Sequence, residues 1–177
     1  MKRIVLTFGL IAGAVLSAMM IGTIPFVDQI GMNWGMVIGY TTMVLAFLLV
    51  FFGIRSYRET VGDGRISFSR ALGVGLLIMT VASICYVITW EIVYFNFMPD
   101  FGDKYAAYAI EKARAAGASA EQIAKQTEEM RKFKAMYDNP LYNAAFTFLE
   151  PLPVGIPMTL ISAAILRKRR REELTHG

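Results

Sequence analysis

Two glutamates in otherwise apolar runs are the residues of this sequence whose type and position best suit chemistry. Glu91 follows Trp90 late in one long run, and Glu150 directly precedes Pro151 early in another. Acidic side chains inside membrane spans are costly and usually face the bundle interior or a water-filled cavity. If the two runs are antiparallel helices, both carboxylates lie near the same, outer face of the membrane.

Two interpretations of Glu91 and Glu150 remain open. In the first, they form a paired acidic site that opens to the outer side and takes a cation, a proton or a basic ligand. In the second, both lie at the depth of the interface, solvated or hydrogen-bonded to Tyr and Trp side chains. No Lys or Arg inside the membrane is available as an obvious partner. An enzyme that uses the two carboxylates inside the membrane is a further alternative.

The remaining residues offer no catalytic arrangement. The only histidine, His176, lies in the charged tail, and the only cysteine, Cys85, lies in an apolar run. A Ser/His or Cys/His nucleophile and a His/Cys metal cluster are therefore absent from the sequence. The segment from Gly62 to Gly64 lacks the spacing of a phosphate-binding loop. We predict a non-enzymatic protein with no catalytic residue, no metal site and no cofactor.

The elements that must position these glutamates are long apolar helices. The 177 residues are 55% hydrophobic, with a mean hydropathy of +0.46. A helix that crosses hydrocarbon needs about 20 apolar residues, and the runs show no alternation that would indicate strands. Four runs are long enough, and they cover about 4–27, 34–54, 66–94 and 141–166. The sequence predicts one all-α integral membrane domain, residues 1–177, with four transmembrane helices.

Two of these runs have alternative interpretations. The first follows Lys2 and Arg3, the layout of a signal peptide, although it is long for one and no convincing cleavage site follows it. The fourth contains Pro151, Pro153 and Pro157, and an interior proline removes a backbone hydrogen bond and clashes with the preceding turn. The resulting break either lines a site, as broken helices do in transporters, or is a kink that serves packing.

Residues 102–138, before the fourth run, have a different composition. They are rich in Ala, Glu and Lys, which favour helix. Gly117 interrupts the segment, and Ser119 with Gln122 has the spacing of a capping box. We predict two helices, about 103–116 and 120–137, that form an outward-facing helical hairpin between the third and fourth transmembrane helices.

Cations fix the expected orientation. The segment from Ile54 to Ala71 is the strongly charged break in the first hundred residues. Arg55 and Glu59, four apart within it, have the spacing of a helical ion pair, which contributes little when exposed. Short loops rich in Lys and Arg stay in the cytoplasm, which places both termini inside and residues 102–138 outside. The tail cations suit either a stop-transfer anchor or contact with anionic lipid. The orientation and lipid-facing cations are Arg55, Arg58, Arg65, Arg70, Arg167, Lys168, Arg169, Arg170 and Arg171.

Small residues recur at every fourth position in the apolar runs, as at Gly9 and Gly13 or at Gly31, Gly35 and Gly39. Such stripes let helices approach closely in lipid. We expect them to pack the first run on the second, and homodimerisation through an unused stripe is the alternative. The aromatic residues between 86 and 97 are typical of an interfacial belt.

The charged break also carries a family resemblance. Its residues Tyr57–Arg58, Gly64, Ile66–Ser67–Phe68, Ala71 and Gly75 resemble the signature of the domain of unknown function 4199 family. The predicted four-span layout and the long segment before the last span are similar to that family as well. The resemblance implies a small multi-pass protein of the bacterial inner membrane with an uncharacterised role, and it brings no catalytic residues.

The predicted function is that of an accessory or interaction component of the membrane, with the hairpin as the recognition element. Its expected partners are the lipid bilayer and another membrane protein or a second copy. Nucleic acid is excluded because the sequence has no basic face with interleaved aromatics. The alternative is a small transporter or channel subunit that uses Glu91 and Glu150.

Overall fold

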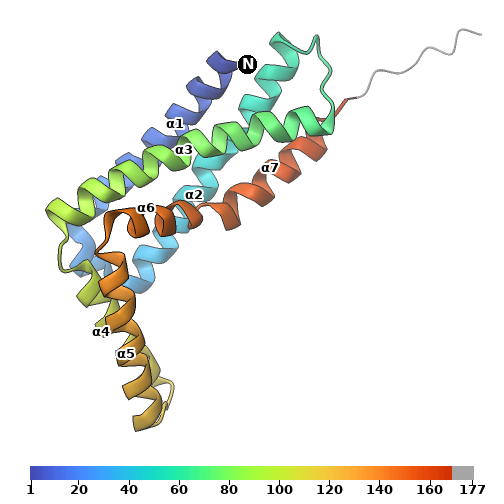
Figure 1. Ribbon diagram of the computed structural model, residues 1–177. Helices are drawn as coiled ribbons and strands as arrows, with labels where there is room; N and C mark the ends of the chain where they lie inside the picture. The colour runs from blue at the N-terminus through green and yellow to red at the C-terminus, as the bar shows by residue number, and fades with distance from the viewer. Residues whose placement is uncertain (169–177) are drawn as a thin grey trace, which may run out of the picture.

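The chain is all-α in a computed structural model that describes residues 1–168. Helices α1, α2, α3 and α7 run along an elongated body, and the pair α4–α5 extends from one end of it at an angle (Figure 1). The elements are α1 (Lys2–Thr23), η1 (Ile24–Phe26), α2 (Val27–Thr60), α3 (Phe68–Phe97), α4 (Phe101–Ala115), α5 (Ala120–Tyr137), α6 (Pro140–Leu149) and α7 (Leu152–Leu166).

Three helical stretches among the described residues are long and apolar enough to cross a membrane. They are Lys2–Thr60, Phe68–Phe97 and Pro140–Leu166. These candidate spans indicate a multi-pass membrane protein.

The first stretch folds back on itself. Phe8 in α1 lies against Gly53 in α2, where a Cβ would be 3.3 Å from the Phe8 Cβ, so the two helices are antiparallel neighbours. The reversal runs through η1, which contains Pro25, and through Gly31, whose φ of 69° and ψ of 167° interrupt α2. Glycine suits this conformation because it has no Cβ to clash. The turn expected at 28–33 is therefore present, and it begins a few residues earlier.

The charged break between the second and third runs is shorter than the sequence indicated. Helix α2 continues to Thr60, so Arg55 and Arg58 are helical, and only residues 61–67 connect it to α3. Arginine and glutamate are good helix formers, and this end of α2 has nothing to stop it before residue 61. Ser67 caps α3 as predicted, because its hydroxyl accepts from the Arg70 N–H at 3.4 Å.

Helix α3 is the central element of the body, because α1, α2 and α7 all pack against it. Gly9 and Gly13 allow α1 to approach Val81 and Cys85 of α3, where a Cβ on either glycine would lie within 2.6 Å of a side-chain carbon. The expectation that this stripe packs on the second run was wrong. Close approach of backbones through small residues is a main source of helix association in lipid. Here the small residues of α1 bring it close to α3, the helix against which the others pack.

The structure of the hairpin agrees closely with the prediction from the sequence. Ser119 and Gln122 form the predicted capping box at the start of α5, and Gly117 makes the turn after α4 with a φ of 80°. Helix α4 begins two residues before the predicted start, at Phe101. The proline-rich fourth run is also broken as predicted, with α6 ending at Leu149 and α7 beginning at Leu152.

The packing of α1 on α3 makes a testable prediction. Gly13→Ala adds a Cβ that would lie 2.5 Å from the Cys85 Cβ, and overpacking of this kind costs about 1–3 kcal/mol. Gly35→Ala is the matched control, since nothing in the described chain lies within 4 Å of the added Cβ. Thermal unfolding in one detergent, followed by circular dichroism, should show a lower Tm for Gly13→Ala alone. Equal shifts in the two variants would contradict this packing.

Candidate functional site

A row of aromatic side chains on α3 defines the junction between the body and the hairpin. Tyr86, Trp90 and Tyr94 are four residues apart and therefore share one face of the helix. All three donate a hydrogen bond to the stretch from the last residue of α5 to the C-cap residue of α6, and we call these three residues the donor row. The acceptors are Glu150 Oε2 at 3.0 Å for Tyr86, Tyr137 Oη at 2.9 Å for Trp90 and Asp138 Oδ1 at 2.6 Å for Tyr94.

A closed network of polar groups surrounds Tyr137. Its hydroxyl lies 3.3 Å from Thr147 Oγ1, which donates to Asn143 Oδ1 at 3.2 Å, and Asn143 Nδ2 donates to the Tyr137 carbonyl at 3.2 Å. The side chains of Tyr137, Asn143 and Thr147 are buried. Because buried polar groups are stable only when they are paired, this network fixes the end of α5 against α6.

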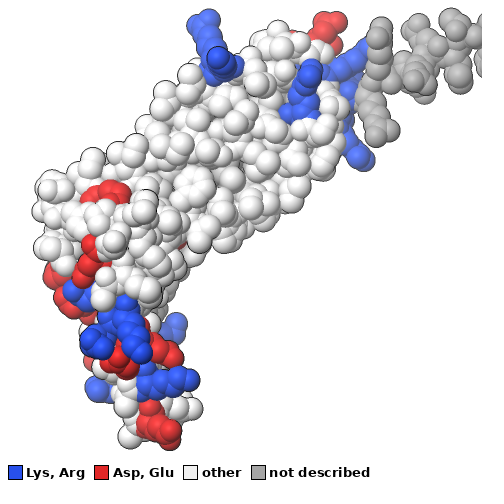
Figure 2. All heavy atoms as spheres, in the orientation of Figure 1, with Lys and Arg blue, Asp and Glu red and all other residues white. Residues whose placement is uncertain are grey.

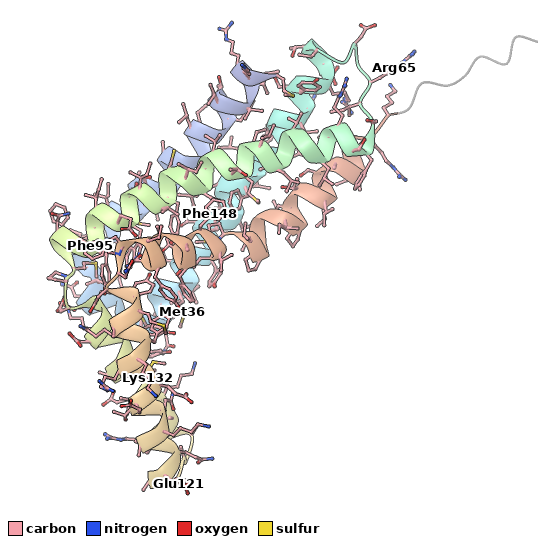
Figure 3. All side chains as sticks on the ribbon, in the orientation of Figure 1. Met36, Arg65, Phe95, Glu121, Lys132 and Phe148 are labelled. Atoms are coloured by element: carbon pink, nitrogen blue, oxygen red, sulfur yellow. The ribbon has the colours of Figure 1, made fainter. Side chains whose placement is uncertain are left out.

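Aromatic packing reinforces the same junction. Trp90 meets Phe101 edge to face at 5.0 Å between ring centroids, and Tyr94 meets Tyr137 at 5.3 Å. Phe133 stacks on Tyr137 at 5.3 Å. Pairs of this geometry contribute about 0.5–1.5 kcal/mol each beyond burial. The donor row, its three acceptors and these rings form what we call the junction cluster, at the place where side chains of α3, α5 and α6 converge in Figure 3.

The hairpin has a second attachment on its other helix. Lys104 of α4 pairs with Asp28 at 2.8 Å, and Tyr108 donates a hydrogen bond to Asn33. Asp28 and Asn33 belong to the reversal between α1 and α2. The base of the hairpin is therefore held from two directions, by the first two helices and by the junction cluster.

Two groups of the junction that lie outside the candidate spans, Asp138 and Tyr137, have shifted pKa values. The hydrogen bond from Tyr94 and the nearby ammonium of Lys134, at 3.2 Å, hold the pKa of Asp138 below its usual value. The stabilisation by this carboxylate is therefore present at neutral pH and lost as the pH falls through the lowered pKa. Burial raises the pKa of Tyr137 to about 12, so its hydroxyl stays protonated at neutral pH.

The structure gives Glu91 and Glu150 different surroundings. Glu150 lies at the α6–α7 break, where it accepts the hydrogen bond from Tyr86. Glu91 is half-buried, and its Oε1 atom has no hydrogen-bond partner in the described chain. No hydrogen bond joins the two side chains within residues 1–168. The role of either carboxylate stays a prediction.

The predicted cations gather at the opposite end of the body. Arg65 lies there, far from Glu121 at the hairpin tip, as Figure 3 shows. Arg55 and Glu59 have the spacing of a helical ion pair, but in the structure Glu59 pairs with Arg58 at 2.6 Å. Adjacent residues point in different directions on a helix, yet the long arginine reaches across. Arg169, Arg170, Arg171 and His176 lie outside the described residues.

The donor row was not identified from the sequence. Aromatic residues grouped as they are between 86 and 97 are typical of an interfacial belt, and the sequence predicts one there. A row that faces the protein interior differs from a belt in what its polar atoms do. The hydroxyl of a buried Tyr or the N–H of a buried Trp usually has a hydrogen-bond partner within the protein. The acceptors come from a segment more than forty residues away, so periodicity on α3 alone could not supply them.

Comparison with known proteins gives a family and no activity. A family model described as protein of unknown function (DUF4199) matches residues 7–168. Neither the curated proteins nor the solved structures contain a significant match to the chain. Within residues 1–168, no group of three or more His, Cys, Asp or Glu side chains is placed to hold a metal ion.

The junction cluster predicts unequal effects for two tyrosines. Tyr137→Phe removes the acceptor of the half-buried Trp90 N–H and the contact with the buried Thr147. Leaving a buried donor unpaired costs about 1–3 kcal/mol, so for this partly exposed donor we expect a loss at the lower end of that range. Tyr142→Phe is the control, because Tyr142 is 37% exposed and its hydroxyl makes no hydrogen bond in the described chain. We expect Tyr137→Phe to lower the Tm in detergent and to speed proteolysis of the hairpin. If the two variants behave alike, the junction cluster does not hold the hairpin.

Proposed function

We propose that this chain, which belongs to the DUF4199 family, is a non-enzymatic accessory protein of the bacterial inner membrane. It crosses the bilayer four times, and its helical hairpin recognises another membrane protein on the outer side. The observation that carries the proposal is a charged helical arm that projects from the apolar body and is fixed to it at the base (Figure 2).

The reversal after α1 supports four crossings. A straight helix over the 59 residues of Lys2–Thr60 would be about 90 Å long at 1.5 Å per residue. The hydrocarbon core is only about 30 Å thick. The 22 residues of α1 alone, about 33 Å by the same rise, suit one crossing. Helix α2 then returns, and α3 and the broken pair α6–α7 supply the other two.

The distribution of charge supports the orientation. Figure 2 shows basic side chains at one end of the body, mixed charges on the hairpin and a broad band almost without charge between them. The basic end contains Arg55, Arg65 and Arg70, and cations near span ends mark the cytoplasmic side. The hairpin segment 99–138 carries seven cations and seven acids, so it imposes little orientation of its own.

The hairpin has the properties of a recognition element. Helix α4 buries none of its residues and α5 buries only Tyr137, so the outer part of the arm packs on nothing but its own partner helix. Its exposed face carries ion pairs such as Glu128 with Arg131 at 2.8 Å. Exposed pairs contribute little stability, and mixed charge on a preformed surface gives specificity and fast association.

One observation favours a second candidate, a small transporter or channel subunit. The break at Glu150–Pro151 sets a carboxylate beside backbone that has lost hydrogen bonds, because Pro153 has no N–H to offer the Leu149 carbonyl. Broken helices with such carbonyls hold ions in transporters. Glu91, with one unpartnered oxygen, would be the second acid of that route.

The topology can be tested directly. In a Cys85→Ser background, single cysteines at positions 65 and 120 should react with membrane-impermeant thiol reagents from opposite sides. We expect position 120 to be labelled in spheroplasts and position 65 only in inside-out vesicles. Labelling of both positions from one side would rule out four crossings.

The recognition role predicts a partner that depends on the hairpin tip. A photo-crosslinking residue in place of Lys125, which is exposed on α5, should trap one reproducible membrane protein. Replacing residues 112–127 by a short Gly/Ser linker keeps Tyr137 and Asp138 in the junction cluster. This truncation should prevent the trapped protein from copurifying with the chain.

The control for that experiment is Glu91→Gln combined with Glu150→Gln. It leaves the hairpin untouched and should leave copurification unchanged. A lost proton or solute flux in liposomes for this double variant, with full flux in the tip truncation, would instead favour the transporter.

A further inference from the structure

Six cations meet at the end of the body that is opposite the hairpin. They come from three segments, namely the last turns of α2, the start of α3 with the loop before it, and the chain after α7. All except the half-buried Arg58 are exposed. We call them the basic rim, and its members are Arg55, Arg58, Arg65, Arg70, Arg167 and Lys168.

The backbone holds these segments together. Ile66 and Lys168 form an antiparallel bridge. The Ile66 N–H donates to the Lys168 carbonyl at 3.2 Å, and the Lys168 N–H donates to the Ile66 carbonyl at 3.0 Å. Arg58 Nη1 also donates to the Leu166 carbonyl at 3.4 Å, at the end of α7. Arg65 therefore stays next to Arg167 and Lys168. Orientation in the bilayer requires cations near this end, but it does not require a backbone bridge that holds the segments carrying them side by side.

The rim is not neutralised by the described part of the chain. The acids near it within residues 1–168 are Glu59 and Asp63, and Glu59 is already paired with Arg58 at 2.6 Å. The hairpin is different, because five of its seven cations have a carboxylate within 4.0 Å. A fixed cluster of one sign at the depth of the interface fits a partner that carries many negative charges in a plane.

We propose that the basic rim is a binding surface for the headgroups of anionic phospholipids in the adjacent leaflet. The inference rests on the membrane placement in the proposed function and adds a ligand class at the other end of the molecule. The phosphodiester charges pair with Arg65, Arg70 and Lys168, and the exposed hydroxyls of Ser67 and Ser69 donate to headgroup oxygens. Each cation near an anionic surface strengthens binding about fivefold.

The test uses the purified full-length chain in detergent, where membrane orientation has no influence. Equal amounts of phosphatidylglycerol and phosphatidylcholine are added, and native mass spectrometry gives the ratio of the two lipids bound. We expect phosphatidylglycerol to be enriched on the wild type. The triple variant Arg65→Gln, Arg70→Gln, Lys168→Gln should lower this enrichment about a hundredfold, given about fivefold per cation.

Two matched variants separate charge at the rim from other effects. Lys125→Gln, Arg131→Gln, Lys132→Gln removes three cations from the hairpin and should keep the wild-type ratio. Arg65→Lys, Arg70→Lys, Lys168→Arg keeps the charges and should also keep the ratio, which would show that the loss in the glutamine variant is not a loss of fold. Failure of the hairpin to capture a partner would not alter these ratios.

Several results would overturn the proposal. Equal binding of the two lipids by the wild type would do so, and so would equal losses in the rim and hairpin variants. Inorganic phosphate that displaces phosphatidylglycerol better than chloride at the same ionic strength would assign the rim to free phosphate instead.

Discussion

The hydrogen bonds from the donor row of α3 are the constraint on which the rest of the structure depends. Tyr86, Trp90 and Tyr94 lie in an apolar helix, where an unpaired hydroxyl or indole N–H is costly. Their acceptors must come from elsewhere in the chain, and they are all supplied by the short stretch between Tyr137 and Glu150. This requirement places α6 beside α3, ends α5 at the surface of the body, and so sets the direction in which the hairpin leaves.

The two ends of the molecule use charge in different ways. On the hairpin, acids and bases alternate and largely pair within one helix, as Glu128 does with Arg131 and Lys132. At the other end, the cations gather without a matching number of acids in the described chain, and a backbone bridge at Ile66 holds them in place. The mixed charges of the hairpin suit selective contact with the surface of a folded protein. The clustered cations at the other end suit contact with a surface of uniform negative charge.

Features that depend on a few neighbouring residues were predictable from the sequence. The caps at Ser67 and Ser119, the hairpin turn at Gly117 and the break at Pro151 follow from local backbone chemistry. Features that depend on distant partners were not. The sequence could not show that Gly9 and Gly13 face α3, since a small-residue stripe fits any close neighbour. The acceptor of Tyr86 was hidden for the same reason, because nothing in α3 identifies Glu150.

The antiparallel hairpin has a consequence for how sequences of this kind can diverge. Helices α4 and α5 begin and end at the same junction. Beyond Tyr105 and Phe133, whose tilted rings lie 6.4 Å apart between centroids, the arm does not touch the buried rings. Whole helical turns can therefore be inserted or deleted around Gly117 without moving any residue of the elongated body. Length polymorphism among related chains should concentrate at this tip, which is also the natural position to graft a foreign domain.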